Sequence, residues 1–221
     1  MKRDYVLITG SSKGLGKELA LLFASNSYNI ILHGRNKLDL QNVKKEIIKK
    51  GVDCIIVTGD IKKDETIDKL YLKSKEKDIS IFINNAGVHC PHLPLEKIND
   101  VDIDDLLNTN LIAPIKLTQR VYRDFFEKKS GVIININSLS GLKSQYHRTL
   151  YCSSKWGLKG FSDTLRMEAE DNNIRIIDVY PGRIKTKKEF KEGMNTKEVA
   201  QKIYDDFKNN DIKIINLFGE R

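Results

Sequence analysis

Short apolar runs alternate with longer amphipathic stretches along the chain. Strands of a parallel sheet are buried on both faces and are therefore apolar throughout, whereas the helices that cover them have one apolar face. The alternation thus predicts a doubly wound α/β sheet of mainly parallel strands with helices on both faces. The seven strands that we predict are Tyr5–Thr9, Asn29–His33, Asp53–Thr58, Ile79–Ile83, Gly131–Asn137, Ile174–Tyr180 and Ile212–Leu217.

Helices are predicted between these strands. The two longest are expected at Thr109–Lys128 and Tyr151–Asp171, and another begins near Thr196. With 221 residues, of which 40% are hydrophobic, the chain can bury one substantial core but is too short for two ordinary domains with a linker. We therefore expect residues 1–221 to form a single domain.

The sequence contains no apolar segment of the roughly 18 residues that a membrane-spanning helix needs. A brief apolar run follows Met1 to Arg3 and is predicted to be a strand rather than a signal peptide. The three cysteines, Cys54, Cys90 and Cys152, are an odd number without paired spacing, which favours a reducing compartment. The prediction is a cytoplasmic protein with no membrane partner.

The net charge of +8 would suit an anionic partner, because a basic surface attracts phosphates. Lysines, however, are spread along the chain with acidic residues between them, and no nucleic-acid-binding motif accompanies them. We expect no nucleic-acid partner. The alternative is a basic protein that binds an anionic polymer or surface, which salt-dependent retention on DNA without dinucleotide affinity would identify.

A glycine-rich turn follows the first predicted strand. Thr9 to Gly16 reads TGSSKGLG, and its glycines allow a tight turn and a close approach of the backbone to a pyrophosphate. The helix that begins near Gly14 would point its free N–H groups at the phosphates. Taken alone, such a turn is also an ordinary connection between a strand and a helix.

Tyr151 and Lys155 lie four residues apart in a predicted helix and so on the same helical face. A phenol has an ordinary pKa of about 10, and a neighbouring ammonium lowers it by stabilising the phenolate. The pair could thus give a proton to a carbonyl oxygen. A Tyr–Lys pair at this spacing is also common by chance, with the ring packed and the ammonium solvated.

The order of these features along the chain resembles the short-chain dehydrogenase/reductase family. The turn matches the pattern T-G-x-x-x-G-x-G of that family rather than the G-x-G-x-x-G of other dehydrogenases. Asn84 to Gly87 (NNAG) follows the fourth strand and Pro181-Gly182 follows the sixth, as in the family. The resemblance implies a Rossmann-like fold and dinucleotide-dependent chemistry.

For the chemistry, the resemblance assigns Tyr151 as the general acid/base and Lys155 as the residue that also holds the nicotinamide ribose. Ser138 would polarise the substrate oxygen by hydrogen bonding, with Ser140 as a local competitor. Asn110 would hold a water for proton relay from the lysine, although an exposed or capping asparagine is the ordinary alternative.

For the cofactor, the resemblance implies contacts from several loops at the carboxyl ends of the strands. The NNAG segment would line the adenosine side, and Asp60 and Ile61 would contact the adenine ring. Thr186 would meet the nicotinamide carboxamide, with Ile184 beside the ring. The complete set is Gly10, Ser12, Lys13, Gly14, Leu15, Gly16, Arg35, Asp60, Ile61, Asn85, Ala86, Gly87, Tyr151, Lys155, Pro181, Gly182, Ile184 and Thr186.

The residues after the second strand favour NADP(H) over NAD(H). Gly34 stands where an NAD enzyme of this kind usually has an aspartate that binds the ribose 2′-hydroxyl. Arg35 could bind the extra phosphate of NADP in a bidentate manner, and Lys13 adds a second cation at the same corner. Each cation alone is also an ordinary solvated charge.

Two segments depart from the family pattern. Only thirteen residues, Arg183 to Asn195, separate Pro181-Gly182 from the next helix, which implies an open or permissive site or one completed by another subunit. The chain after the last strand is short, and homodimerisation through the two long helices is expected. His89 to His92 (HCPH) contains zinc-ligand residue types, but no second ligand cluster accompanies it, so we expect no metal site.

We therefore expect an NADP(H)-dependent oxidoreductase that interconverts a ketone or aldehyde and the matching alcohol by hydride transfer. Its partner would be a small-molecule carbonyl or alcohol. The alternative is a catalytically silent protein that binds NADP in a regulatory or structural role. Such a protein would bind the cofactor equally well after Tyr151→Phe and would reduce no carbonyl.

Overall fold

The structure is a computed structural model and describes residues 3–89, 92–185 and 192–217. Its centre is a seven-stranded parallel sheet with the strand order β3-β2-β1-β4-β5-β6-β7. The chain therefore builds the sheet outward from β1 to β3, returns to the middle, and continues on the other side with β4. The strands are β1 (Tyr5–Ile8), β2 (Asn29–Gly34), β3 (Cys54–Thr58), β4 (Ile81–Asn84), β5 (Gly131–Ile136), β6 (Ile174–Pro181) and β7 (Ile214–Leu217).

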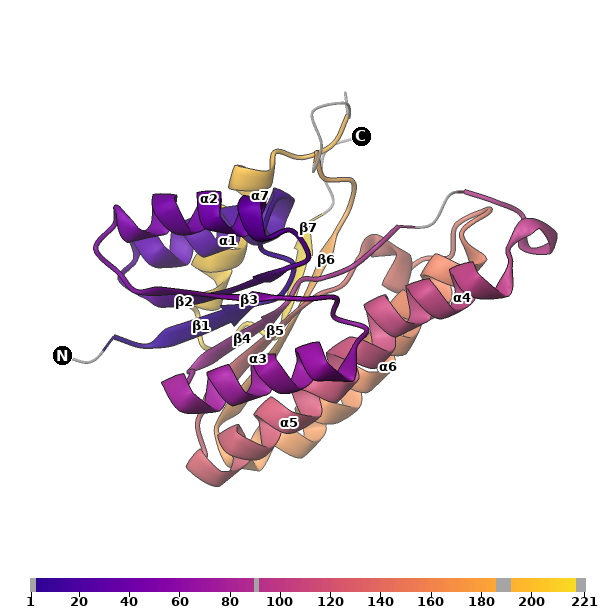
Figure 1. The fold of residues 1–221 in the computed structure, drawn as a ribbon. Coiled ribbons are helices and arrows are strands. Elements are labelled where there is room, and N and C mark those ends of the chain that lie inside the picture. Colours follow the sequence, from indigo (N-terminus) through magenta and orange to yellow (C-terminus); the bar gives the residue numbers. More distant parts are fainter. Residues whose placement is uncertain (1–2, 90–91, 186–191, 218–221) are drawn as a thin grey trace.

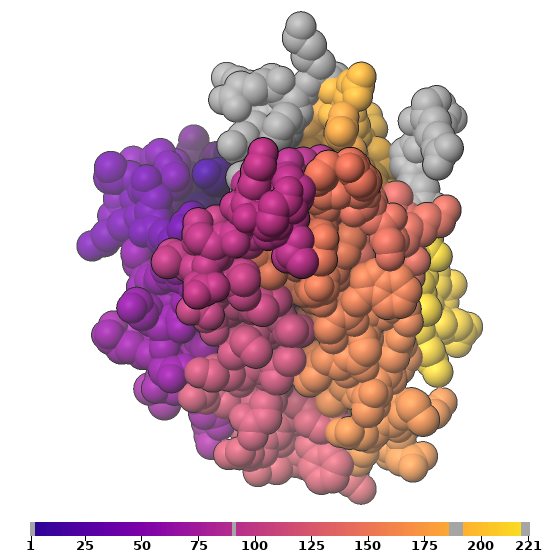
Figure 2. Space-filling model, turned by 90° about the vertical axis from the view of Figure 1, so that its right-hand side faces the viewer, coloured from indigo at the N-terminus to yellow at the C-terminus, as the bar shows by residue number. Residues whose placement is uncertain are grey.

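Helices cover both faces of this sheet (Figure 1). One face carries α1 (Gly14–Ser25), α2 (Lys37–Ile48) and α7 (Thr196–Phe207), and the other carries α3 (Asp64–Lys77), α5 (Ala113–Lys128) and α6 (Thr149–Ala169). The short helix α4 (Asp100–Leu107) packs against α6, and Figure 2 shows α4, α5 and α6 side by side on one face of the molecule. Short helical turns are η1 (Leu95–Lys97), η2 (Asn108–Ile112), η3 (Leu139–Gly141) and η4 (Glu170–Asn172).

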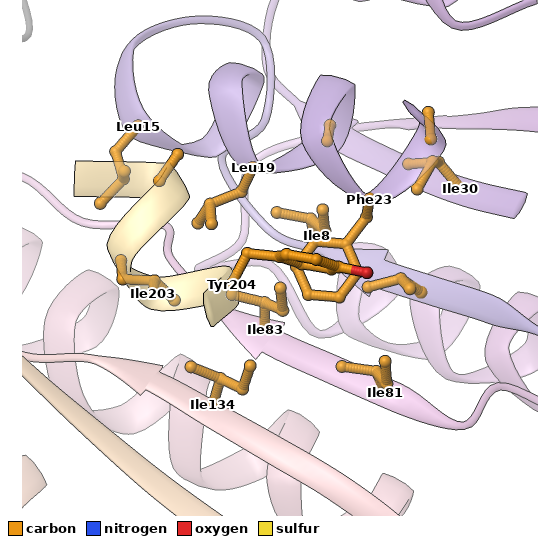
Figure 3. Packing of buried hydrophobic residues seen from close by; sticks show 14 of the residues in the cluster. Ile8, Leu15, Leu19, Phe23, Ile30, Ile81, Ile83, Ile134, Ile203 and Tyr204 are labelled. Atoms are coloured by element: carbon orange, nitrogen blue, oxygen red, sulfur yellow. The ribbon is translucent and has the colours of Figure 1, made fainter. Parts of the chain in front are cut away.

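The core lies in two large clusters, one on each face of the sheet. Successive side chains of a strand point to opposite faces, so Val6 and Ile8 enter one cluster while Leu7 enters the other. In the first cluster the fully buried Phe23 packs its ring edge-on against Tyr204 at a centroid distance of 5.1 Å (Figure 3). This contact joins α1 to α7 and fixes the helix that follows the glycine-rich turn.

The doubly wound sheet predicted from the sequence is confirmed, and the strands start or end within two residues of their predicted bounds. The prediction of a helix from Thr109 was wrong in its first turn. Asn108–Ile112 forms a π-helical turn, and α5 begins only at Ala113. Pro114 explains the difference, because it has no N–H for the carbonyl of Asn110 and its ring clashes with a regular helix there. The other long helix starts earlier than expected, at Thr149, and ends at Ala169.

Candidate active site

The predicted site residues converge at the carboxyl ends of the central strands. The glycine-rich turn follows β1, the NNAG segment follows β4, Ser138 follows β5, and Gly182 follows β6. The order of the strands reverses between β1 and β4, and ligands of such sheets bind outside the strand ends at this reversal. Chain segments that are far apart in the sequence thus come together at one edge of the sheet.

The glycines of the turn are required by the backbone itself. Gly10 and Gly14 have φ angles of +65° and +58°, in the left-handed region that favours glycine. A Cβ on Gly10 would lie 2.8 Å from the Cα of Ala86, and one on Gly16 would lie 2.4 Å from the carbonyl oxygen of Gly10. The turn therefore folds tightly against the segment after β4, and Leu15 is buried beneath it.

Thr9 and Asn85 hold this turn in place. The Oγ1 atom of Thr9 accepts hydrogen bonds from the backbone N–H groups of Asn85 and Ala86, each at 3.0 Å. In return, the side-chain amide of Asn85 donates to the carbonyl oxygens of Thr9 at 2.9 Å and Gly10 at 3.0 Å. Asn85 therefore positions the loop itself, in addition to the adenosine-side role that was expected of it. Gly87 lies beside the Asn110 side chain.

His33, which the sequence did not single out, is a further support of the turn. Its Nδ1 accepts a hydrogen bond from the backbone N–H of Gly10 at 3.3 Å, and its Nε2 lies 3.2 Å from the carbonyl oxygen of Gly59. The ring therefore has its proton on Nε2 and bridges the loops after β1 and β3. Burial lowers the pKa of His33 to about 4, although the Gly59 carbonyl opposes this. His33 is therefore neutral at physiological pH.

We expect His33 to make the protein acid-sensitive. Its folded-state pKa of about 4 lies below the ordinary value of about 6.5, so the unfolded chain binds more protons between these values. The stability contributed by neutral His33 is complete above pH 6.5 and is lost as the pH falls through 4, a loss of about 3 kcal/mol. Urea unfolding at pH 7 and pH 4 should show a smaller pH dependence in His33→Asn than in the wild type. The partly exposed His147, changed to Asn, is the control, and an unaltered pH dependence in His33→Asn would contradict the prediction.

Two cations, Lys13 and Arg35, lie where we expect the selectivity for NADP to be determined. Lys13 is the N-terminal cap residue of α1, whose first turn has no acidic residue, and its side chain is exposed. Arg35 is also exposed and follows Gly34 directly. A Cβ on Gly34 would lie 3.2 Å from Ser12, so position 34 faces the glycine-rich turn. The helix dipole and the nearby cations together favour an anion here.

Asp60 and Ile61 follow β3, as predicted. The Oδ1 of Asp60 accepts a hydrogen bond from the backbone N–H of Lys62 at 3.1 Å, and the Lys62 ammonium contacts both Asp60 and Asp105. Ile61 is buried in the second core cluster. These contacts fix the loop that carries the backbone of Asp60 next to Gly59, the partner of His33.

Tyr151 and Lys155 are both buried on one face of α6. The Nζ of Lys155 lies 5.9 Å from the centroid of the Tyr151 ring and donates a hydrogen bond to the carbonyl oxygen of Ile136 at 3.1 Å. Burial lowers the pKa of Lys155 to about 8. The ring of Tyr151 also stacks against His89 at 4.9 Å and against the guanidinium of Arg148 at 4.6 Å.

Ser138 begins the 3₁₀ turn at the end of β5. Its Oγ accepts a hydrogen bond from the backbone N–H of Ser140 at 3.2 Å. Ser140 itself is fully buried and donates its hydroxyl to Gln145, so its side chain serves the turn. Of the two serines, Ser138 is the one with an accessible side chain at the strand end.

Asn110 lies in the π-helical turn and is buried. Its Oδ1 accepts from the backbone N–H of Val88 at 2.8 Å, and its Nδ2 donates to the carbonyl oxygen of Val88 at 2.9 Å. The side chain therefore ties the segment after NNAG to the helices.

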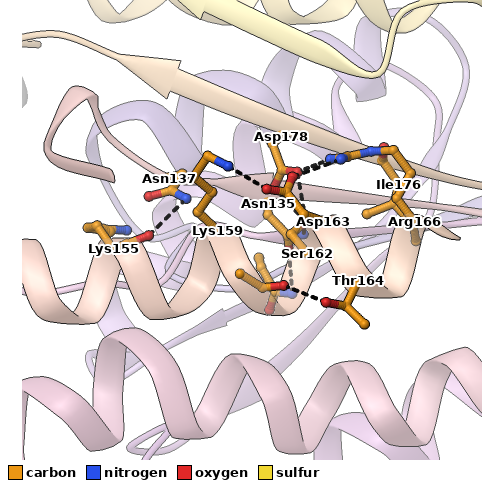
Figure 4. A network of polar contacts seen from close by, with 12 residues as sticks. Asn135, Asn137, Lys155, Lys159, Ser162, Asp163, Thr164, Arg166, Ile176 and Asp178 are labelled. Atoms are coloured by element: carbon orange, nitrogen blue, oxygen red, sulfur yellow. Dashed lines mark hydrogen bonds and ion pairs between the residues drawn. The ribbon is translucent and has the colours of Figure 1, made fainter. Parts of the chain in front are cut away.

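Helix α6 is tied to the sheet by buried polar contacts (Figure 4). The side-chain amide of Asn137 in the loop after β5 donates to the backbone carbonyl of Lys155 at 3.2 Å. Farther along the helix, the hydroxyl of Ser162 donates to the Asp178 carboxylate on β6 at 2.6 Å. These contacts hold the helical face that carries Tyr151 and Lys155 in register with the strand ends.

The last predicted segment follows β6. The backbone N–H of Gly182 donates to the carbonyl oxygen of Leu217 at 2.7 Å, which anchors the Pro181-Gly182 turn to β7. Ile184 forms a β-bridge with Met194, so the chain folds back on itself after the turn. Thr186 lies outside the described residues.

The described residues 3–89, 92–185 and 192–217 contain no group of three His, Cys, Asp or Glu side chains that could hold a metal ion. Cys90 and Pro91 of the HCPH segment lie outside this part of the chain. Among the helices that the structure describes, none is both long enough and apolar enough to cross a membrane.

Comparison with known proteins identifies relatives over most of the chain. A family model described as short chain dehydrogenase matches residues 4–197. Sepiapterin reductase of Chlorobaculum tepidum is 32% identical over 193 residues, which are 83% of this chain and 79% of that protein. The NADP-dependent 3-hydroxy acid dehydrogenase of Schizosaccharomyces pombe is 32% identical over 206 residues, which are 90% of this chain and 78% of that protein.

Solved structures show the same fold. An alcohol dehydrogenase of Comamonas testosteroni that is specific for bulky-bulky ketones superposes with a TM-score of 0.91 and covers 98% of this chain and 86% of its own, at 24% identity. A metagenomic short-chain oxidoreductase in complex with NADP superposes with a TM-score of 0.88 at 24% identity, with 99% and 97% covered.

Proposed function

This chain belongs to the short chain dehydrogenase family and is an oxidoreductase of alcohol and carbonyl groups; we propose that it uses NADP(H), with Tyr151 as the general acid/base. The observation that carries the proposal is the burial of Tyr151 and Lys155 on one face of α6, where Lys155 donates a hydrogen bond to the carbonyl oxygen of Ile136 at the end of β5. We propose Asn110, Ser138, Tyr151 and Lys155 as the catalytic residues.

The residues present fit a dinucleotide. The tight turn between β1 and α1 leaves no space for side chains at Gly10 and Gly16, and the α1 N-terminus has neither an acidic residue nor a side-chain cap. A helix N-terminus of this kind favours the binding of a phosphate group. When bound, NADPH supplies the hydride that reduces the carbonyl carbon. The predicted cofactor residues from Gly10 to Thr186 remain a proposal, of which Arg35 is tested below.

The chain's own contribution is proton transfer and orientation. In the direction of reduction, the Tyr151 hydroxyl donates its proton to the carbonyl oxygen, and the Lys155 ammonium stabilises the resulting phenolate. Because burial lowers the pKa of Lys155 to about 8, the ammonium form predominates below that pH. The Ser138 hydroxyl would hydrogen-bond the same carbonyl oxygen and fix its position.

The direct test is a titration of the purified protein with NADPH and with NADH. Trp156 adjoins Lys155 and is 47% exposed, so its fluorescence can report binding. Preferential NADPH binding followed by turnover in a screen of ketones and aldehydes would support the proposal. Binding of neither dinucleotide would refute it.

The Arg35→Ala variant tests the cofactor preference. We expect NADPH affinity to fall about 10- to 100-fold, the value of a charge-assisted hydrogen bond to a phosphate, while NADH affinity changes less than about 3-fold. Fluorescence titration of both dinucleotides measures this. Arg123→Ala on α5 removes the same charge far along the chain and serves as the control. Equal weakening of NADPH and NADH by Arg35→Ala would contradict NADP selectivity at this corner.

We also propose that the protein is a homodimer formed through α5 and α6. Phe126 on α5 is 50% exposed and Met167 on α6 is 77% exposed, and a groove between the helices is lined by Tyr122, Phe161 and Leu165. Exposed apolar surface of this kind favours a protein partner. Phe126→Arg should shift the sedimentation coefficient toward that of the monomer, whereas Leu72→Arg on α3 should not. A wild-type chain that sediments as a monomer would contradict the proposal.

We propose that the protein lies in a reducing compartment, the cytoplasm. Cys54 and Cys152 are free and buried. Burial raises the pKa of the Cys54 thiol to about 12, which makes it unreactive toward oxidation. Fractionation of cells is the direct check of this location.

A further inference from the structure

We propose that the carbonyl substrate carries a carboxylate and that Arg148 binds this group beside Tyr151. The substrate class is thus an oxo acid, and the alcohol form is a hydroxy acid. The inference rests on the proposed function, because it places the anion next to the residue proposed as general acid.

Arg148 lies at the entrance to α6, directly over the ring of Tyr151. It is the N-terminal cap residue of the helix, and its guanidinium carbon lies 4.6 Å from the ring centroid. Its Nη1 donates to the side-chain carbonyl of Gln145, whereas its Nε is buried and has no acceptor among the described residues. A group bound to this guanidinium would therefore lie next to the Tyr151 side chain.

In the part of the chain that the structure describes, the Arg148 guanidinium has no carboxylate within ion-pair distance. The partly buried Arg166, by contrast, pairs with both Asp163 and Asp178. A partly buried cation without a counter-ion is unfavourable, and an anionic ligand would relieve this.

Arg148 also lies near His92, together with two further basic side chains. The pKa of His92 is lowered, chiefly by burial and additionally by the positive charges of Arg148, Arg183 and His147, so these groups lie within electrostatic reach of His92. Arg183 has a carboxylate partner, Glu192, at 2.8 Å. The first turn of α6 has no acidic residue, so its dipole adds positive potential at Arg148. The field therefore attracts an anion to the mouth of the site.

The position of Arg148 over the Tyr151 ring would suit a bifunctional substrate. The carbonyl oxygen would meet the hydroxyls of Tyr151 and Ser138, while the carboxylate would meet the Arg148 guanidinium. In the reaction Tyr151 would give a proton to the carbonyl oxygen, and the carbonyl carbon would receive the hydride that bound NADPH supplies. The products are the hydroxy acid and NADP⁺, solvent reprotonates Tyr151, and the carboxylate is unchanged. Arginine binds carboxylates through two parallel hydrogen bonds, which would fix the carbonyl for the transfer.

The experiment compares acids with their methyl esters. Pyruvate, acetoacetate and levulinate, in which the carbonyl and carboxylate are progressively farther apart, are assayed with NADPH beside the three esters. We expect kcat/KM for at least one acid to exceed that for its ester by about 10- to 100-fold, the range of a charge-assisted hydrogen bond. In Arg148→Gln this ratio should fall toward one. Lys143→Gln removes an exposed cation from the same loop and should leave the ratio as in the wild type.

A binding measurement accompanies the kinetics. Calorimetric titration of the NADPH-saturated protein with butyrate and with butyramide compares a carboxylate with a neutral group of the same shape. Butyrate should bind at least about 10-fold more tightly in the wild type and not in Arg148→Gln. NADPH binding by the variant shows that it is folded, since Arg148 is outside the proposed cofactor residues. Should the variant fail to fold, the acid-to-ester ratio of the wild type still decides whether the substrate carries a carboxylate.

The outcomes separate the two proposals. Turnover of esters or neutral ketones without preference for any acid, or an acid preference that Arg148→Gln retains, overturns the carboxylate site and leaves the oxidoreductase proposal intact. A loss of turnover on acids and esters alike in the folded variant also overturns it and makes Arg148 a positioning residue for the Tyr151 ring. Absence of NADPH binding and of all turnover in the wild type overturns both proposals.

Discussion

Replacing Tyr151 with phenylalanine is expected to lower kcat for carbonyl reduction about 10³-fold, within the range that a general acid contributes. The ring would stay in place between His89 and Arg148, because phenylalanine keeps the shape that stacks against both. Only the hydroxyl is lost, and with it the proton donor. NADPH affinity should change about 10-fold at most, since no more than one neutral hydrogen bond is removed. Steady-state kinetics and fluorescence titration of the same preparation measure both quantities.

Tyr146→Phe is the matched control for this variant. Tyr146 is 87% exposed, lies in the loop before α6 and carries the same hydroxyl, so its loss should leave kcat within about 3-fold of the wild type. A Tyr151→Phe enzyme with more than about a tenth of the wild-type kcat would show that another group supplies the proton. If the wild type binds NADPH but turns over no carbonyl, the catalytically silent alternative gains support instead.

The fold was predictable because strands of a parallel sheet are buried on both faces and are therefore continuous apolar runs in the sequence. The apolar runs from Tyr5 to Leu217 located every strand of the described sheet. The glycines of the sequence located the turn after β1, where Gly10 and Gly14 have positive φ in the structure. The packing of α6 against the 3₁₀ turn η3, which Ser138 begins, also follows from topology, because η3 comes directly after β5. These features were predictable because they depend on the local spacing of residues and on the way in which consecutive elements of a parallel sheet are connected.

Other features depend on contacts that no local pattern encodes. Pro114 was visible in the sequence, but a proline in the first turn is also compatible with a regular helix start, so the π-helical turn before it is known only from the structure. His33 supports the glycine-rich turn only because β2 pairs with β1 and β3, which brings Gly10 and Gly59 to its two nitrogens. Arg148 looked like any loop arginine. Its position over Tyr151 and its lack of a carboxylate among the described residues are known only from the structure.

A ladder of buried polar side chains crosses the sheet beneath the site. Asn84, Asn135 and Asp178 occupy paired positions on β4, β5 and β6. The amide of Asn84 donates to the side-chain oxygen of Asn135 at 2.9 Å, the amide of Asn135 donates to Ser162 on α6 at 2.8 Å, and Ser162 donates to Asp178. At the end of this ladder, Arg166 forms an ion pair with Asp178 (Figure 4). Ser162 and Arg166 of α6 are thus both anchored to the Asp178 carboxyl on β6.

Removal of Arg166 from this ladder is expected to be strongly destabilising. Asp178 is fully buried, and burial raises the pKa of its carboxyl, an effect that Ser162 and Arg166 oppose. In Arg166→Met the carboxylate would remain buried without a counter-ion, at a cost of about 3–5 kcal/mol in the free energy of unfolding at pH 7. Urea unfolding at 25 °C measures the loss. Lys69→Met breaks an exposed ion pair with Glu65 on α3 and should cost less than about 1 kcal/mol.

Two further measurements tie the loss to the charge of Asp178. Without Arg166 the folded-state pKa of Asp178 would lie still farther above its unfolded value, so the folded chain binds more protons between the two values. The deficit of Arg166→Met should therefore shrink as the pH falls from 7 toward 5. The double variant Arg166→Met, Asp178→Asn should recover about 2 kcal/mol at pH 7, because the neutral amide still accepts from Ser162. A deficit that is independent of pH and unrelieved by Asp178→Asn would assign the effect to lost packing of the Arg166 side chain instead.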